Sequence, residues 1–161
     1  MKTTIGIDNG PTGSIGIICP HGEIFEPMPA MDSLHYGKKG TVSKRLDWKE
    51  LRDLIINTVG DDKPRLAFVE RPFTGQFVKT AISAARFFEA TLIVLEDLGI
   101  GYRTIDSKVW QKPILGDVKG SDNLKKASRL RGIEMYPEHA TAIKQQKDAD
   151  GLLIAHHFHF S

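Results

Sequence analysis

Four carboxylates stand where apolar stretches of this sequence begin or end. Asp8 closes an apolar run near the start of the chain, and Glu70 closes a second one. Asp148 and Asp150 come just ahead of a third. Carboxylates in buried surroundings are costly to desolvate unless they are neutralised, and a metal ion neutralises several at once. Acids from separate segments could thus hold two Mg²⁺ ions, which activate water and stabilise the leaving oxygen in phosphodiester cleavage.

Each of these acids also has an ordinary structural interpretation. Asp8 could satisfy its own turn, and Asp148 could cap a helix. Glu70 could form an ion pair with Arg65 or Arg71. For any single acid this interpretation has at least equal weight. The combination favours a site, because every acid lies where elements would end at one active-site face.

The elements around the first acid predict a β-meander. Two β-branched runs, at 4–8 and 14–19, flank a cluster of turn-forming residues at 9–13, and a third short run covers 23–26. This pattern predicts three antiparallel strands. Residues 28–45 combine Pro, Gly and Ser with a run of basic side chains, which predicts a mobile basic loop.

Helices and strands alternate along the remainder of the chain. The apolar spacing predicts, in order, a helix over 48–59, a strand over 65–70, a helix over 77–98, a strand over 101–105, a helix from about 121 to 131 and a helix from about 148 to 155. Asp47 is the predicted N-cap of the first helix, and Gly60 and Gly99 are predicted helix stops.

Composition limits the class of protein. A chain of 161 residues predicts one compact domain over 1–161. The net charge of +2 does not by itself indicate a polyanionic partner. The single cysteine, Cys19, excludes an internal disulfide framework and a cysteine-rich zinc site. No run approaches the length of a membrane span, so we expect a soluble cytoplasmic protein with no membrane partner.

Several segments together resemble the RuvC-like Holliday junction resolvases, in particular their phage-borne branch. The similarity spans almost the whole chain, and both the order and the spacing of the segments agree. The segments are TIGIDNG at 4–10, GSIG at 13–16, FVE at 68–70, SKVWQK at 107–112, KGSDNLKKAS at 119–128 and DADGLLIA at 148–155.

This resemblance implies an α/β, ribonuclease H-like fold with a central mixed five-stranded sheet flanked by helices. It implies a homodimer, with the long helix after Glu70 as the interface, in the cytoplasm of a bacterium or a phage-infected host cell. The implied activity is metal-dependent, symmetrical nicking of four-way and other branched DNA, with two Mg²⁺ ions or with Mn²⁺ in their place. By resemblance, Asp8 would bridge both metals, Glu70 would help to hold one, and Asp150 would complete the site.

The sequence departs from the family at one ligand. Family members place a fourth acid, or a histidine, three or four residues before the last acid, where this chain has Lys147 and Gln146. Asp148 is the available substitute. Residues i and i+2 of a regular helix do not share a face, so Asp148 can join Asp150 only if the chain is still extended there. Otherwise three carboxylates would remain and activity would be weak or absent.

Positive charge gathers in two parts of the sequence. Between 103 and 131, eight basic residues stand against three acids. These residues could contact DNA phosphates, or they could form an ordinary solvated helix face. The candidate phosphate contacts are Lys38, Lys39, Lys44, Arg45, Lys108, Lys112, Lys119, Lys125 and Lys126. Phe73 and Gln76 follow Glu70 where related enzymes present a loop to the junction, although an aromatic residue there could also be a core or dimer contact.

Other features have weaker functional interpretations. Trp48 and Trp110 are predicted packing residues with polar handles. The histidines at 156, 157 and 159 predict a helix end with exposed imidazoles rather than a metal site.

Two other functions remain open. Residues 8–13 resemble the phosphate hairpin of actin-like and sugar-kinase ATPases, but those proteins need two such domains, and Pro11 removes an N–H that could hold phosphate. The other alternative is a catalytically weak or inactive module of the resolvase fold that binds branched DNA without cutting it.

Overall fold

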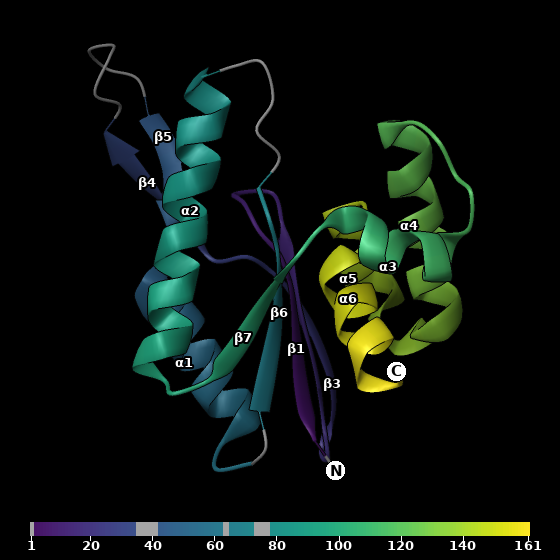
Figure 1. Ribbon diagram of the computed structural model, residues 1–161, viewed down its shortest axis with the longest axis horizontal. Helices are drawn as coiled ribbons and strands as arrows, with labels where there is room; N and C mark the ends of the chain where they lie inside the picture. The colour runs from purple at the N-terminus through teal and green to yellow at the C-terminus, as the bar shows by residue number, and fades with distance from the viewer. Residues whose placement is uncertain (1, 35–41, 63–64, 73–77) are drawn as a thin grey trace.

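A mixed five-stranded sheet forms the middle of the protein (Figure 1). The computed structural model describes residues 2–34, 42–62, 65–72 and 78–161. The strands, in spatial order, are β3 (Gly22–Pro27), β2 (Ser14–Cys19), β1 (Thr3–Asp8), β6 (Arg65–Glu70) and β7 (Gly101–Ile105). This order, with helices on both faces, is the predicted central sheet.

Strand pairing brings two of the acids to one edge of the sheet. β1 pairs antiparallel with β2, and β2 pairs antiparallel with β3, which is the predicted meander. β1 and β6 are parallel, with Ile7 opposite Val69. The next residues along these strands are Asp8 and Glu70, so both acids lie at the same end of neighbouring strands.

The helices cover the sheet as two separate layers (Figure 1). The first layer contains α1 (Trp48–Val59) and α2 (Val78–Asp97). The second contains α3 (Ser107–Leu115), α4 (Ser121–Met135), the short 3₁₀ helix η1 (Pro137–His139), α5 (Ala140–Gln146) and α6 (Asp150–His159). A separate two-stranded sheet of β4 (Ala30–Leu34) and β5 (Val42–Leu46) stands beside α2.

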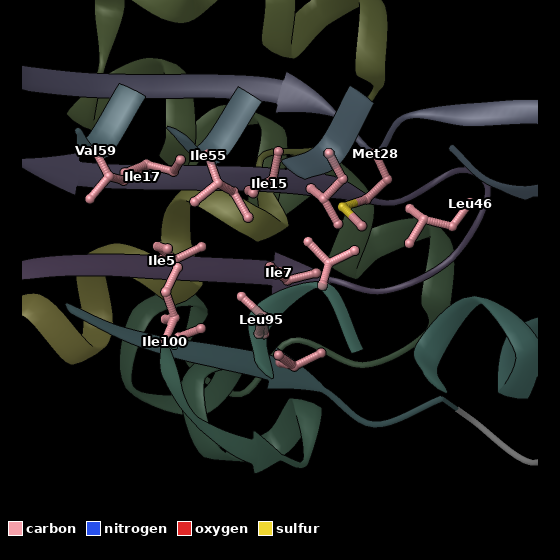
Figure 2. Packing of buried hydrophobic residues seen from close by; sticks show 14 of the residues in the cluster. Ile5, Ile7, Ile15, Ile17, Met28, Leu46, Ile55, Val59, Leu95 and Ile100 are labelled. Carbon is pink, nitrogen blue, oxygen red and sulfur yellow. The ribbon is translucent and has the colours of Figure 1, made fainter. Parts of the chain in front are cut away.

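Two hydrophobic clusters, one on each face, hold these layers to the sheet. Alternate residues of β1 and β2, such as Ile5 and Ile15, point toward α1 and α2, where they meet Ile55 and Leu95 (Figure 2). The opposite cluster packs α6 against the sheet, together with the fully buried Trp110 of α3. The residues of α6 from 151 to 155 are all buried, so this helix is a core element and not an amphipathic surface helix.

Glycines allow α6 to lie directly on the backbone of the sheet. A Cβ on Gly6 would overlap the backbone of Gly151 and Ala155, and one on Gly16 would overlap the backbone of Leu152. These strand positions therefore have no room for a side chain. The close approach carries the first residue of α6 to the strand end at which Asp8 lies.

Most predicted elements are confirmed. Asp47 caps α1 by accepting a hydrogen bond from the Glu50 N–H at 3.1 Å. Gly60 and Gly99 follow α1 and α2 with positive φ angles of 53° and 61°. Cys19 is a buried free thiol.

In the connecting segments, one prediction is wrong and two helices were not predicted. The expected loop over 28–45 contains β4 and β5, because the two segments pair with each other and Leu46 is buried in the core. A helix over 107–115 was not predicted, because Pro113 indicates a helix break; here it lies in the last turn of α3, which the buried Trp110 holds in place. α5 was also missed, because seven residues with one buried side chain carry too little periodicity.

None of the helices described by the structure is long and apolar enough to cross a membrane.

Candidate metal centre

Three aspartates converge at the end of β1. Asp8, Asp148 and Asp150 each offer one carboxylate oxygen, and these oxygens all lie within 4.8 Å of one another. Asp8 is the last residue of β1, and Asp150 is the first residue of α6. Two segments from opposite ends of the sequence therefore meet in one acidic cluster, which could bind metal ions.

Asp148 joins the cluster because the chain around it is not helical. Lys147 ends α5 in the left-handed region, with φ of 79°, and Ala149 is not helical either, with φ of −131° and ψ of 23°. The Asp148 side chain accepts a hydrogen bond from the Asp150 N–H at 3.4 Å. The i, i+2 spacing is therefore no obstacle, because Asp148 precedes the helix whose first residue is Asp150.

Hydrogen bonds fasten this corner to the β1–β2 turn. The Gly151 N–H donates to Ser14 Oγ at 3.0 Å. Gln146 Nε2 donates to the carbonyl oxygens of Thr12 and Gly13, at 2.8 and 2.9 Å. Gln146, which occupies a position where the resembled family has an acid, thus bonds to the turn that follows Asp8.

Glu70 lies beside this cluster and is held by a tryptophan. Trp110 Nε1 donates to Glu70 Oε2 at 2.7 Å, and the indole is fully buried. Glu70 is close enough to the aspartates for its charge to raise the pKa of both Asp8 and Asp150. The alternative ion pairs are not formed, because Arg71 pairs with Asp106 and Arg65 bonds to the Gly60 carbonyl.

A buried hydroxyl group donates a hydrogen bond to Asp150. The Ser128 hydroxyl, on α4, donates to Asp150 Oδ1 and accepts a hydrogen bond from the Ala149 N–H at 3.0 Å. Ser128 is 1% exposed. It therefore joins α4 to the start of α6 at the point where the carboxylates meet.

Burial raises the pKa of all four acids. Burial is the largest cause for Asp8, followed by the charges of its acidic neighbours. Burial, together with the Asp148 charge, raises the pKa of Asp150 to about 7. The pKa values of Asp148 and Glu70 are also raised, again chiefly by burial. Ionising the whole cluster at neutral pH is therefore unfavourable without added positive charge.

The donor set suits a hard divalent cation. Across the described segments, no ion pair within 4.0 Å involves any of the four acids. Lys125 is close enough to lower the pKa of Asp8, Asp148 and Asp150, but this effect is smaller than that of burial. Oxygen-only carboxylate donors match Mg²⁺, Mn²⁺ or Ca²⁺, whereas soft metals prefer sulfur and nitrogen.

The residues predicted to contact DNA lie in separate parts of the structure. Lys108, Lys112 and Lys119 line one hollow of about 190 Å³ between α3 and α4. Lys125, in the first turns of α4, lies near the acids, and the next residue, Lys126, is exposed. All five lysines belong to the α3–α4 region, and the charge of Lys125 reaches the acidic cluster.

Of the other predicted contacts, the two that the structure describes are not part of this group. Lys44 pairs with Asp32 on the β4–β5 sheet, and Arg45 lines a hollow against α2. Lys38, Lys39, Phe73 and Gln76 lie outside the described residues.

The sequence analysis missed the donors around the acids. Trp110 is a packing residue with a polar handle, as predicted, but the handle holds Glu70. Nothing in the sequence singles out Ser128, because its partner is 22 residues away. Trp48 is 45% exposed and is not a core residue.

The prediction of exposed imidazoles at the C-terminus is also wrong. The histidines at 156, 157 and 159 are partly buried, and burial lowers the pKa of each. His156 Nδ1 lies 2.7 Å from the Tyr136 hydroxyl, and His159 Nδ1 lies 3.1 Å from Thr4 Oγ1.

Comparison with solved structures shows which fold holds these acids. A structure of Thermus thermophilus RuvC in complex with a Holliday junction substrate matches with a TM-score of 0.56 at 18% identity, over 99% of this chain and 94% of that one. The chain has the ribonuclease H-like fold of RuvC. A second structure of Thermus thermophilus RuvC matches with a TM-score of 0.53 at 15% identity, over 98% of this chain and 93% of that chain. No protein-family model and no curated protein matches the sequence.

Proposed function

We propose that this protein is a metal-dependent endonuclease that nicks branched DNA symmetrically, with four-way junctions as its main substrate. The observation that carries the proposal is the convergence of Asp8, Asp148 and Asp150 within a RuvC fold. Their buried oxygens need a positive partner, and the fold is one in which a Thermus thermophilus relative was seen with a Holliday junction.

The four acids have distinct positions toward bound metal. Asp8, Asp148 and Asp150 would hold Mg²⁺ between them, and Glu70 would complete a second position from the neighbouring strand. Two such ions, or Mn²⁺ in their place, would supply an activated water and stabilise the leaving oxygen. The chain's own part is to hold these carboxylates together and oriented at one strand end, while the metal would favour their ionised form.

The surroundings of the acids suit a polyanionic substrate. The lysines at 108, 112, 119, 125 and 126 lie in the α3–α4 region, and the charge of Lys125 reaches the acidic cluster. Lysine contacts to phosphates position a nucleic acid without reading its sequence. A positive border around an acidic centre would draw the backbone toward the carboxylates, while divalent metal offsets their repulsion of phosphate.

Symmetrical nicking requires two active sites, and we propose that α2 forms the contact between two copies. Ile82 and Ile93, on the outer face of α2, are 55% and 56% exposed. Ile93 and Trp48 line an apolar hollow of about 300 Å³ between α1 and α2. A second copy would cover this surface, which lies on the opposite side of the sheet from α3 and α4.

We also propose that residues 1–161 form one nuclease domain of the phage type that acts in the cytoplasm of a bacterium or an infected host cell. Helices of this same chain cover both faces of the sheet and bury a hydrophobic cluster on each, as expected of one domain.

One observation favours a second candidate, a module that binds branched DNA without cutting it. Gln146, at a position where the resembled family has an acid, donates to the Thr12 and Gly13 carbonyls and is not a metal ligand. If Asp148 cannot replace that acid in function, three carboxylates remain.

A cleavage assay separates the two candidates. Purified protein is incubated with a labelled synthetic four-way junction or a linear duplex of the same sequence, with Mg²⁺ or with EDTA. Paired nicks in the junction that need Mg²⁺ would support the nuclease. Tight junction binding without nicks, with either Mg²⁺ or Mn²⁺, would contradict it and support the binding module.

A further inference from the structure

Two buried side chains that are not themselves metal ligands donate hydrogen bonds to two of the acids. Trp110 on α3 bonds to Glu70, and Ser128 on α4 bonds to Asp150. We infer that Trp110 and Ser128 are positioning residues that set the metal preference of the site, by engaging one oxygen of each carboxylate and thereby favouring Mg²⁺ over Ca²⁺. This inference rests on the proposed function, since it assumes that the carboxylates bind metal.

The packing of the core determines where the Trp110 donor lies. The indole is fully buried among the residues that hold α6 to the sheet. A buried indole N–H without a partner is costly, so ring position and hydrogen bond reinforce each other. Glu70 lies at a strand end in register with Ile105 of β7. Both partners are thus fixed by regular structure, and Glu70 Oε2 is held at 2.7 Å from the indole.

The Ser128 hydroxyl is equally constrained. Its oxygen accepts the Ala149 N–H, which leaves its single hydrogen for Asp150 Oδ1. One turn along α4, a Cβ on Gly132 would overlap the Ala149 side chain. This close approach of α4 to the start of α6 keeps the serine beside Asp150.

The consequence is that three of the four carboxylates each have one oxygen engaged by the protein. Besides Glu70 and Asp150, Asp148 accepts the Asp150 N–H through Oδ1. Among the described residues, no hydrogen bond reaches the second oxygen of any of these three acids. Each acid is therefore set up to offer one oxygen to a metal.

Ligation through one oxygen discriminates between the two common cations. Mg²⁺ requires a near-ideal octahedron, and the two oxygens of one carboxylate are too close together to fill two octahedral positions well. Ca²⁺ takes six to eight oxygens and readily uses both oxygens of a carboxylate. A donor that is bonded to one carboxylate oxygen leaves the other oxygen for Mg²⁺. The same donor hinders Ca²⁺ from binding through both oxygens of that carboxylate.

The test measures metal binding without DNA. The melting temperature of the metal-free protein is followed while MgCl₂ or CaCl₂ is added, since a ligand that binds the folded state raises it. Trp110→Phe removes the N–H and keeps an aromatic ring, and Ser128→Ala removes the hydroxyl. Each variant should need about tenfold more Mg²⁺ for the same stabilisation, as is typical when the hydrogen-bond partner of a metal ligand is removed. The Ca²⁺ concentration needed for the same stabilisation should stay unchanged or fall. The Ca²⁺ to Mg²⁺ ratio, meaning the ratio of these two required concentrations, should therefore drop about tenfold.

Two variants control for the removal of hydrogen bonds elsewhere. Thr4→Val removes a hydroxyl that bonds to His159 at the far end of α6. Tyr102→Phe removes a hydroxyl that donates to the Glu96 carboxylate at 2.8 Å. Both should lower the melting temperature slightly and leave the Ca²⁺ to Mg²⁺ ratio unchanged.

The outcomes separate this inference from the proposed function. A wild-type protein that nicks junctions and prefers Mg²⁺, with variants that keep the same ratio, would overturn the inference alone. A wild-type protein that neither nicks nor gains stability from either metal would overturn both. If Trp110→Phe does not fold without metal, Ser128→Ala decides: a lowered ratio supports the inference, and an unchanged ratio overturns it.

Discussion

Asp150 carries a large electrostatic cost at the site, as Asp8 also does. It lies at the start of a core helix, beside other acids, and its pKa is raised to about 7. Folding therefore opposes the ionisation of Asp150. The folded protein loses stability when this group ionises, at the place where we propose that metal binds. Stability given up at an active site in this way is a common feature of enzymes.

This cost predicts an unusual dependence of stability on pH. Between the ordinary pKa of 3.8 and about 7, folded protein keeps a proton on Asp150 that unfolded protein loses. Stability from this group is complete below about pH 4 and is lost as the pH rises through about 7. In EDTA, the free energy of unfolding should be lower at pH 8 than at pH 5, by up to about 3 kcal/mol from this group, because only the interval between pH 5 and a pKa of about 7 contributes.

Denaturant unfolding at the two pH values measures this effect. Asp150→Asn should flatten the dependence, and Mg²⁺ should restore stability to the wild type at pH 8. The exposed Asp53→Asn on α1 is the control and should behave like the wild type. A metal-free wild type that is more stable at pH 8 than at pH 5 would contradict the account.

At the scale of elements, the site depends on how closely α6 approaches the sheet. Gly16 lets the backbone of Leu152 lie against β2. The same contact brings Asp148 and Asp150 to Asp8. Packing of α6 on the sheet therefore also brings the three aspartates of the cluster together.

A methyl group added to β2 at Gly16 should move Asp148 and Asp150 away from Asp8. Gly16→Ala would overlap backbone, not a flexible side chain, so α6 must shift. We expect a loss of roughly 1–3 kcal/mol in unfolding free energy, and weaker metal binding by the thermal titration. Gly101→Ala, on β7, meets only the Leu66 side chain at 3.6 Å and should change neither. Equal effects of the two substitutions would refute the role given to this contact.

The elements that carry the acids were predictable, and much of what lies between them was not. Asp8 and Glu70 end strands whose apolar runs are visible in the sequence, so their shared edge follows from parallel pairing. Asp148 was uncertain, because the left-handed turn at Lys147 has no signal in the sequence. Trp110 and Ser128 were missed as donors because they meet their acids only through packing of α3 and α4.

At the scale of the whole molecule, the two helical layers suit different partners. The layer of α3 to α6 carries Asp150 and the α3–α4 lysines, and Asp150 meets Asp8 at the end of β1. The layer of α1 and α2 exposes apolar side chains. A dimer through the α1–α2 layer would leave both acidic centres open to DNA.

The lysine border should determine how DNA binding responds to salt. Removing one lysine that neutralises a phosphate reduces the slope of log affinity against log salt by about 0.9. Lys125→Gln with Lys126→Gln should weaken junction binding and reduce the slope by between about 1 and 2, measured by fluorescence anisotropy at several salt concentrations. Lys49→Gln, on α1, should keep the wild-type slope. An unchanged slope in the double variant would remove these lysines from the interface.

The proposed dimer should depend on the exposed face of α2. Wild-type protein at micromolar concentration should sediment as a dimer. Ile93→Glu places a charge in the apolar hollow and should give monomers that remain folded, because this side chain is 56% exposed. Glu89→Gln, on an exposed position of the same helix, is the control for a change of charge. A wild-type monomer would contradict the dimer.

The most direct test of the metal centre compares cleavage and binding in two aspartate variants. Asp8→Asn and Asp148→Asn keep the side-chain shape and remove one carboxylate each from the cluster. With Mg²⁺ and a labelled four-way junction, we predict that Asp8→Asn abolishes nicking, that Asp148→Asn lowers its rate by at least about 100-fold, and that both bind the junction as tightly as the wild type. Wild-type rates of nicking in Asp8→Asn would contradict the account, because catalysis would then not depend on this cluster.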